Sequence, residues 1–164
     1  MSSFSGFGNF RFSNIQLIQN KRYKKIEKSF RSHDIVLIKC EILPMYNKWH
    51  HIWNFRGLTN LVDLDLSYNS LTRIPTSAIV GCKYLMRLSL KGNLGIREVS
   101  GDSFSGMKDL NYLDLSECGI ENILRGAFTH LKNLAYLRLH SNVLKTISPV
   151  KAFPPDLRYW YISI

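Results

Sequence analysis

The sequence predicts an α/β solenoid: a right-handed, curved array of stacked modules with a parallel β-sheet on its concave side and an irregular or short-helical convex side. Its template is the stretch 61–74, in which apolar residues recur at fixed spacings around Asn69. The spacing returns in modules that start at Leu85, Leu110 and Leu134, in steps of 24, 25 and 24 residues. An apolar residue, usually Phe, stands six positions before each start. Self-similarity at a fixed period of this size indicates a solenoid.

Each module contains a short run in which apolar and polar residues alternate. Leu64 and Leu66 point to one side of a strand, and Asp63 and Asp65 point to the other. A single strand of this kind cannot bury its apolar side, whereas parallel copies stacked ~4.8 Å apart share one core. The return segments, which carry Phe104 and its equivalents, are wider than a strand. The stack is therefore expected to curve with the strands on the inside.

We expect one array over residues 1–164, with its first and last modules incomplete. The modules start near residues 12, 35, 61, 85, 110, 134 and 157. The first is read from Phe12 to Asn20, and Tyr23 and Ile26 follow it in the return segment. Two registers compete for the second module, one starting at Ile35 and the other at Leu37. The first is preferred because Phe30 then holds the place of Phe104.

The net charge of +10 is concentrated near the start of the chain. A basic cluster follows Asn20 and is expected on a loop; it consists of Lys21, Arg22, Lys24, Lys25 and Lys28. A solvated loop accounts for it, and a patch for an acidic protein or a polyanion is the alternative. Only Tyr23 interleaves the cluster, and it is assigned to the core. Because nucleic-acid sites pair basic residues with stacking aromatics, we expect no nucleic-acid binding.

The cysteines, the lengths of the apolar runs and the first 30 residues bear on the cellular compartment of the chain. Cys40, Cys82 and Cys118 occupy apolar positions of the modules and are expected to be buried, free thiols. No apolar run approaches the ~20 residues of a membrane-spanning helix. The first 30 residues lack the basic head and apolar stretch of a secretory signal.

Where each strand ends and the chain turns, most modules carry an asparagine. Its buried amide can bond backbone groups of its own turn and of the neighbouring turn. We expect a structural asparagine ladder made of Asn20, Asn69, Asn93 and Asn142. Cys118 holds this position in one module.

Function is expected on the residues that face out of the concave sheet. Neighbouring modules align, so Tyr112, Tyr136 and Tyr159 are predicted to form one aromatic stripe. Tyr and Arg are enriched at binding hot spots, although a merely polar inner face is the alternative. The candidate partner-binding residues are Arg87, Tyr112, Asp114, Tyr136, Arg138, His140, Tyr159 and Tyr161.

Catalytic and metal sites are not indicated. His33, Cys40 and the pair His50 and His51 match no zinc spacing. A triad of Asp114, His140 and Ser163 would lie on an open sheet without oxyanion donors. We therefore expect no enzyme activity, no metal and no cofactor.

The modules resemble the leucine-rich repeat family, in its typical class of about 24 residues, as in Toll-like receptor ectodomains and extracellular adhesion proteins. The resemblance implies a non-catalytic, receptor-like or adhesive module that binds a protein ligand or co-receptor on its concave face, outside the cell or at its surface. An intracellular (cytoplasmic) scaffold and the substrate-recruiting part of an enzyme such as a ubiquitin ligase are the alternatives. Incomplete modules at both ends also predict self-association.

Overall fold

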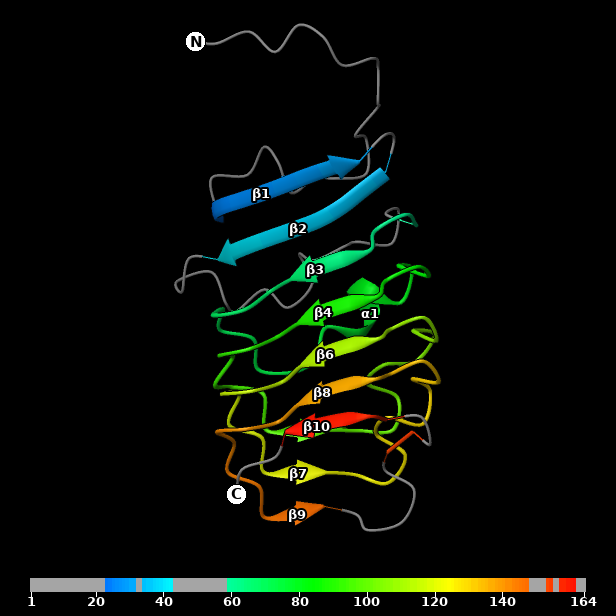
Figure 1. Ribbon diagram of the computed structural model, residues 1–164. Coiled ribbons are helices and arrows are strands. Elements are labelled where there is room, and N and C mark those ends of the chain that lie inside the picture. Colours follow the sequence, from blue (N-terminus) through cyan, green and yellow to red (C-terminus); the bar gives the residue numbers. More distant parts are fainter. Residues whose placement is uncertain (1–22, 32–33, 43–58, 148–152, 155–156, 162–164) are drawn as a thin grey trace, which may run out of the picture.

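The structure is a computed structural model that describes residues 23–31, 34–42, 59–147, 153–154 and 157–161 (Figure 1). For the first two of these ranges it describes the backbone. The elements, in chain order, are β1 (Tyr23–Arg31), β2 (Asp34–Ile42), β3 (Asp63–Asp65), α1 (Thr76–Ile79), β4 (Arg87–Ser89), β5 (Glu98–Val99), β6 (Tyr112–Asp114), β7 (Asn122–Ile123), β8 (Tyr136–Arg138), β9 (Thr146–Ile147) and β10 (Tyr159–Tyr161).

The main sheet has seven strands in the order β1-β2-β3-β4-β6-β8-β10. From β2 to β10 neighbouring strands are parallel, and equivalent residues of successive modules face each other. Leu64 pairs with Leu88, Leu88 with Leu113, and Leu113 with Leu137. This register confirms the predicted solenoid with a parallel sheet. In the second module Ile38 of β2 pairs with Leu64, which is the alignment of the register that starts at Ile35.

The start of the described chain differs from the prediction. Tyr23 and Ile26 were assigned to a return segment, but they lie in β1, which pairs with β2 in antiparallel fashion. Phe30 lies in β1 too, opposite Ile35, and not in a return position. The physical reason is the connection: only two residues separate these nine-residue strands, and so short a link permits only antiparallel pairing.

Two related predictions share that region. The loop expected for the basic cluster is wrong at Lys24, Lys25 and Lys28, which are part of β1. The module read from Phe12 to Asn20 lies outside the described residues. One array over residues 1–164 remains a prediction.

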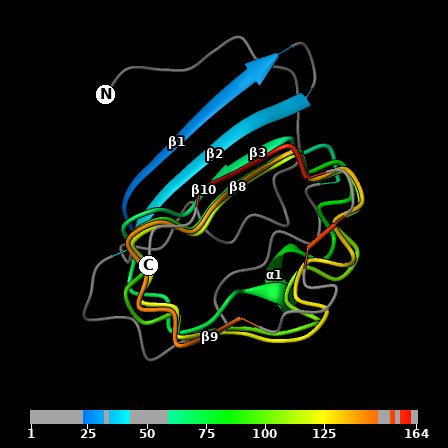
Figure 2. The ribbon, with the colours of Figure 1, turned by 60° about the horizontal axis from the view of Figure 1, so that its bottom comes forward.

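The core lies between the main sheet and a second, three-stranded parallel sheet, β5-β7-β9, with α1 in the return segment of one module (Figure 2). The inward leucines of β3, β4, β6 and β8 are fully buried or nearly so. On the return side Phe104, Phe128 and Phe153 stack on one another, with ring centroids 6.0 and 5.6 Å apart. Each ring thus contacts the equivalent ring of the next module, and the modules share one continuous core.

The buried asparagines link adjacent modules. The Asn93 amide nitrogen donates to the carbonyl oxygens of Leu66, 2.9 Å away, and Leu90, 2.6 Å away. Its amide oxygen accepts from the Leu71 backbone nitrogen at 3.1 Å. Asn142 repeats this pattern two modules further along the array, donating to the Leu115 carbonyl oxygen at 2.8 Å.

The two remaining members of the ladder differ. Asn69 donates to the carbonyl oxygens of Leu66 and Ser67, and Asn20 lies outside the described residues. At the cysteine position, the Cys118 thiol donates to the Leu90 carbonyl oxygen, with sulfur and oxygen 3.1 Å apart. The cysteine thus keeps the donor of the asparagine side chain but has no amide oxygen to accept a bond.

The residue before each ladder position turns the chain away from the strand. Its φ angle is positive in all four modules, from 54° at Tyr68 through 73° at Gly92 to 57° at Glu117 and Ser141. Glycine adopts this conformation without strain, and other residues adopt it at some cost. A Cβ at Gly92 would lie 2.4 Å from an atom of the Tyr68 ring. The absence of a side chain at Gly92 therefore leaves room for this ring.

Cys82 and Cys118 are free and buried, and burial raises the pKa of the Cys82 thiol to about 12 and that of Cys118 to about 11. Both stay protonated at neutral pH. Among the described residues, no helix has the length and apolar character needed to cross a bilayer.

Candidate functional site

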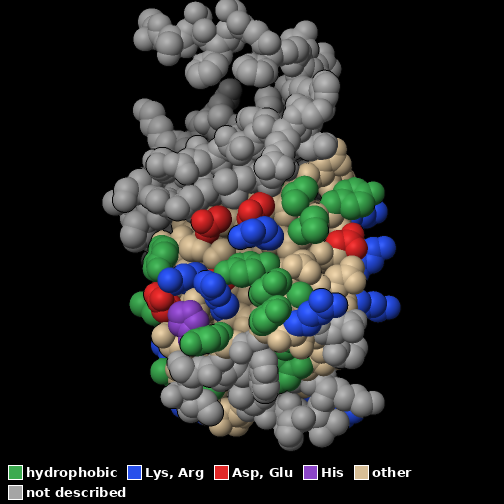
Figure 3. Space-filling model, in the orientation of Figure 1, with side chains coloured by type: hydrophobic (Ala, Val, Ile, Leu, Met, Phe, Trp, Pro, Cys, Tyr) green, Lys and Arg blue, Asp and Glu red, His purple; other side chains and the backbone are tan. Residues whose placement is uncertain are grey.

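The outward side of the main sheet, here called the open face, carries all eight candidate binding residues on or directly after β4, β6, β8 and β10. They lie one above another because equivalent residues of successive modules pair in register. Apolar side chains and basic side chains adjoin one another across this face (Figure 3).

Three of these residues, Tyr112, Tyr136 and Tyr159, form the tyrosine stripe. The rings of Tyr136 and Tyr159 stack with centroids 4.8 Å apart and an interplanar angle of 10°. Tyr112 is tilted against Tyr136, at 6.4 Å. The two stacked rings are 43% and 59% exposed, so a large aromatic surface is ordered by its neighbours yet open to solvent.

Two arginines flank Tyr112. The Arg87 guanidinium lies 5.1 Å from the centre of the Tyr112 ring, and that of Arg138 lies 5.6 Å away. Each also pairs with a carboxylate on the preceding strand, Arg87 with Asp63 at 3.4 Å and Arg138 with Asp114 at 3.7 Å. Such partly exposed pairs contribute little stability. Their effect is to hold the long side chains beside the stripe.

Asp114 is the anchor of this cluster and is only 4% exposed. One of its oxygens accepts from the Ser116 backbone nitrogen and hydroxyl, and the other accepts from the Tyr112 hydroxyl at 3.2 Å. Burial, and next the Asp114 carboxylate, raise the pKa of Tyr112. The phenol therefore stays a donor at neutral pH and fixes the orientation of its ring.

The far end of the open face carries His140 and Tyr161. The two rings meet edge to face with centroids 6.1 Å apart, and Tyr161 is 71% exposed. Further toward the turns, Lys91 pairs with Glu117 at 3.1 Å. These residues extend the stripe sideways, so that the exposed aromatic area reaches from β6 to the last described strand.

On the described side chains of the open face, from β3 to β10, basic groups lie beside carboxylates. Arg87, Arg138 and Lys91 each lie next to a carboxylate on an adjacent module. Burial raises the pKa of one of these, Asp63, and Arg87 opposes the shift. The described part of this face therefore shows no excess of unpaired positive charge. The face offers aromatic rings and hydrogen-bonding groups, which suit a protein surface better than a polyanion.

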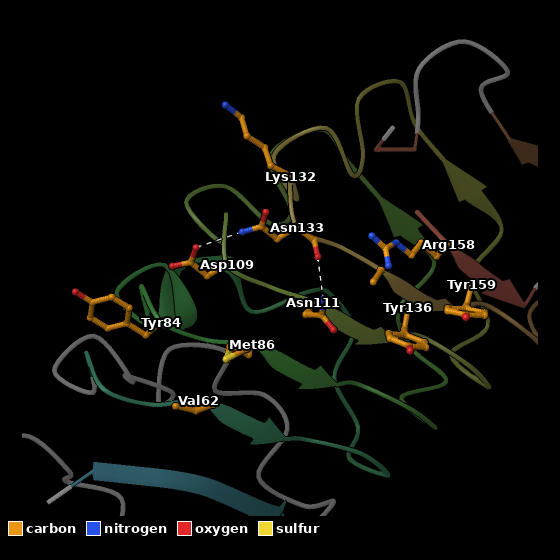
Figure 4. A pocket seen from close by; sticks show the side chains of 11 residues that line it. Val62, Tyr84, Met86, Asp109, Asn111, Lys132, Asn133, Tyr136, Arg158 and Tyr159 are labelled. Atoms are coloured by element: carbon orange, nitrogen blue, oxygen red, sulfur yellow. Dashed lines mark hydrogen bonds between the residues drawn. The ribbon is translucent and has the colours of Figure 1, made fainter. Parts of the chain in front are cut away.

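A second feature of the site was not predicted. A groove of about 770 Å³, here called the lateral groove, runs along the edge where the strands begin (Figure 4). Tyr136 and Tyr159 belong both to this groove and to the tyrosine stripe. The other residues that line it are Val62, Tyr84, Met86, Asp109, Asn111, Lys132, Asn133, Ala135 and Arg158.

The missed residues share positions in the module. Val62, Met86, Asn111, Ala135 and Arg158 each follow the first leucine of a module. The residue type at this position differs from module to module. The periodic pattern therefore predicts that the position is exposed, but it does not predict that a groove lies there. The only available signal was the adjoining turn, in which exposed Tyr84 precedes Leu85 directly.

No cluster of three His, Cys, Asp or Glu side chains among the described residues could hold a metal ion. Asp114, the most buried carboxylate of the site, is engaged by Ser116, Tyr112 and Arg138. Ser163, the third member of the triad considered above, lies outside the described residues.

Comparison with known proteins identifies the modules. The family model for leucine rich repeats matches residues 54–94 and 83–144. Human vasorin is 34% identical over 113 residues, which are 67% of this chain and 16% of vasorin. Leucine-rich repeat-containing G-protein coupled receptor 5 of Rattus norvegicus is 38% identical over 89 residues, 54% of this chain and 10% of the receptor. The chain therefore spans about a sixth or less of these relatives.

A solved structure gives the same answer. Internalin C2 of Listeria monocytogenes superposes with a TM-score of 0.52 and 27% identity over 66% of this chain and 45% of the internalin. Because the family model covers more than half of the residues and the strands stack in register, this chain belongs to the leucine-rich repeat family.

Proposed function

We propose that this chain is a non-catalytic protein-binding module and that its partner, a protein ligand or co-receptor, docks on the open face over the tyrosine stripe. The observation that carries the proposal is the stacked, solvent-open pair Tyr136 and Tyr159, with Tyr112 and two arginines held beside it. Rings ordered before binding lose little conformational entropy when a partner covers them. Tyr and Arg side chains in this state are typical hot spots.

The proposal includes a location outside the cell or at its surface. It rests on the relatives, because the rat protein is named as a receptor. Self-association through the ends of the array stays a prediction from the sequence.

The partner can be trapped by a photo-crosslinker placed at Tyr136. A matched control carries the crosslinker at Leu124, which is exposed and lies after β7 in the second sheet, away from the open face. We expect a protein that is cross-linked from position 136 and not from position 124. Equal labelling from both positions would contradict docking on the open face.

The trapped protein then tests the stripe itself. We expect the triple variant Tyr112→Ala, Tyr136→Ala, Arg138→Ala to bind it at least ~100-fold more weakly, because each truncated hot spot costs about 2 kcal/mol or more. Circular dichroism should be unchanged. The control pair Lys108→Ala and Arg125→Ala removes two exposed cations elsewhere and should bind normally. Undiminished affinity of the triple variant would rule out the stripe as the site.

A further inference from the structure

The lateral groove has properties that the open face lacks, beginning with its walls. Tyr84 and Met86 are 59% and 49% exposed at one end, and Tyr136 and Tyr159 stand at the other (Figure 4). Val62 adds apolar surface beside Met86, and Ala135 adds it beside Tyr136. A hollow lined by exposed, ordered apolar side chains next to a binding face can receive side chains of a partner.

Four backbone carbonyls in the floor of the groove already accept hydrogen bonds from the next module. The Val62 carbonyl oxygen accepts from the nitrogens of both Met86 and Arg87, at 2.9 and 3.0 Å. The Met86, Asn111 and Ala135 carbonyls each accept from two nitrogens of the next module in the same way. These four carbonyls leave no free row of acceptors for an added strand, so recognition here depends on side chains.

Charge separates the groove from the open face. Lys132 and Arg158 line it, and neither has an ion-pair partner among the described residues. The one carboxylate of the lining, Asp109, accepts from the Asn133 amide at 3.5 Å and lies near Tyr84, away from Arg158 (Figure 4). On the open face, by contrast, the arginines are paired. Lys132 and Arg158 are therefore unpaired cations of the lining, and Arg158 lies at the end of Tyr136 and Tyr159.

We propose that the lateral groove binds an extended acidic segment of the protein partner, with carboxylates beside Lys132 and Arg158 and an apolar side chain against Met86 and Tyr84. The inference rests on the proposed function, because the groove shares Tyr136 and Tyr159 with the tyrosine stripe. From Val62 to Arg158 the groove crosses four strand spacings of ~4.8 Å, or about 19 Å. An extended segment of about six residues covers that length.

The test uses a displayed library of random hexapeptides, selected in parallel on the full chain and on the double variant Lys132→Glu, Arg158→Glu. We expect the unmodified chain to enrich peptides with two or more Asp or Glu and at least one aromatic or long aliphatic residue. The best synthetic peptide should bind the double variant at least ~10-fold more weakly and should shift the Met86 methyl resonance of the unmodified chain.

The double variant Arg73→Glu, Arg125→Glu is the matched control, because it changes the net charge equally at exposed residues outside the groove. It should bind the peptide within about twofold of the unmodified chain. The inference is overturned if no peptide is enriched, if the enriched peptides are not acidic, or if both double variants weaken binding equally.

A trapped partner protein separates this inference from the proposed function. If the Tyr112→Ala, Arg138→Ala variant loses the partner and the Lys132→Glu, Arg158→Glu variant keeps it, only the groove inference fails. If the groove variant loses the partner and the open-face variant keeps it, docking over the stripe fails and the groove remains.

Discussion

Replacing Phe128 by Ala is expected to lower the free energy of unfolding by about 3–5 kcal/mol. Phe128 is fully buried, and its ring stacks between Phe104 and Phe153. Truncation removes its own apolar surface and leaves a cavity that both neighbouring rings line. Since domains are typically stable by only about 5–15 kcal/mol, this is a large share of the total. Urea denaturation followed by circular dichroism measures the loss.

The conservative variant Phe128→Leu is the control for this prediction. Leucine refills most of the volume but forms no aromatic stack, so we expect less than half of the loss. Replacement of exposed Thr129, the next residue, by Ala should change stability by no more than about 0.5 kcal/mol. A loss below about 1 kcal/mol for Phe128→Ala would mean that the return segments do not share a stacked core.

Replacing Asn93 by Ala is expected to cost on the order of 1–3 kcal/mol. The Leu66 carbonyl oxygen keeps a bond from Asn69, and that of Leu90 keeps a weak one from the Cys118 thiol. The Leu71 backbone nitrogen loses its hydrogen bond to the Asn93 amide oxygen and becomes a buried donor without that acceptor. The loss of stability therefore comes mainly from the backbone N–H of Leu71, which loses its hydrogen-bond acceptor. Chemical denaturation again provides the measurement.

Exposed Asn133 offers a matched asparagine-to-alanine control, for which we expect a change within about 0.5 kcal/mol. At position 93 the Asp variant should be worse than the Ala variant, because it retains the acceptor but loses both donated bonds and buries a charge. Equal stability of the unmodified chain and Asn93→Ala would show that the ladder is not a source of cohesion between modules.

The parallel sheet could be predicted because its cause is local and repeated. The alternation around Leu64 recurs at Leu88, Leu113 and Leu137, and a strand that must bury the same side in every module can pair only in register. The stripe followed for the same reason. Alignment of Tyr112, Tyr136 and Tyr159 is a direct consequence of that register.

Features that depend on a change of pattern could not be predicted in this way. Around β1 the module template was extended to Tyr23 and Ile26 by matching spacings. The extended runs on either side of residues 32–33 favour an antiparallel pair instead. The lateral groove escaped prediction for another reason. Met86, Asn111 and Ala135 hold the same position on successive modules and line the groove, but they share no residue type that a periodic pattern could reveal.

Nuclear Overhauser effects between leucine methyl groups test the central claim most directly, which is that successive modules stack edge to edge around one core. The account predicts contacts from Leu64 to Leu88, from Leu88 to Leu113 and from Leu113 to Leu137, in this order only. Leu64 and Leu137 lie three strand spacings apart, about 14 Å, and should show no contact. A direct contact between Leu64 and Leu137, or the absence of contacts between neighbouring modules, would contradict it.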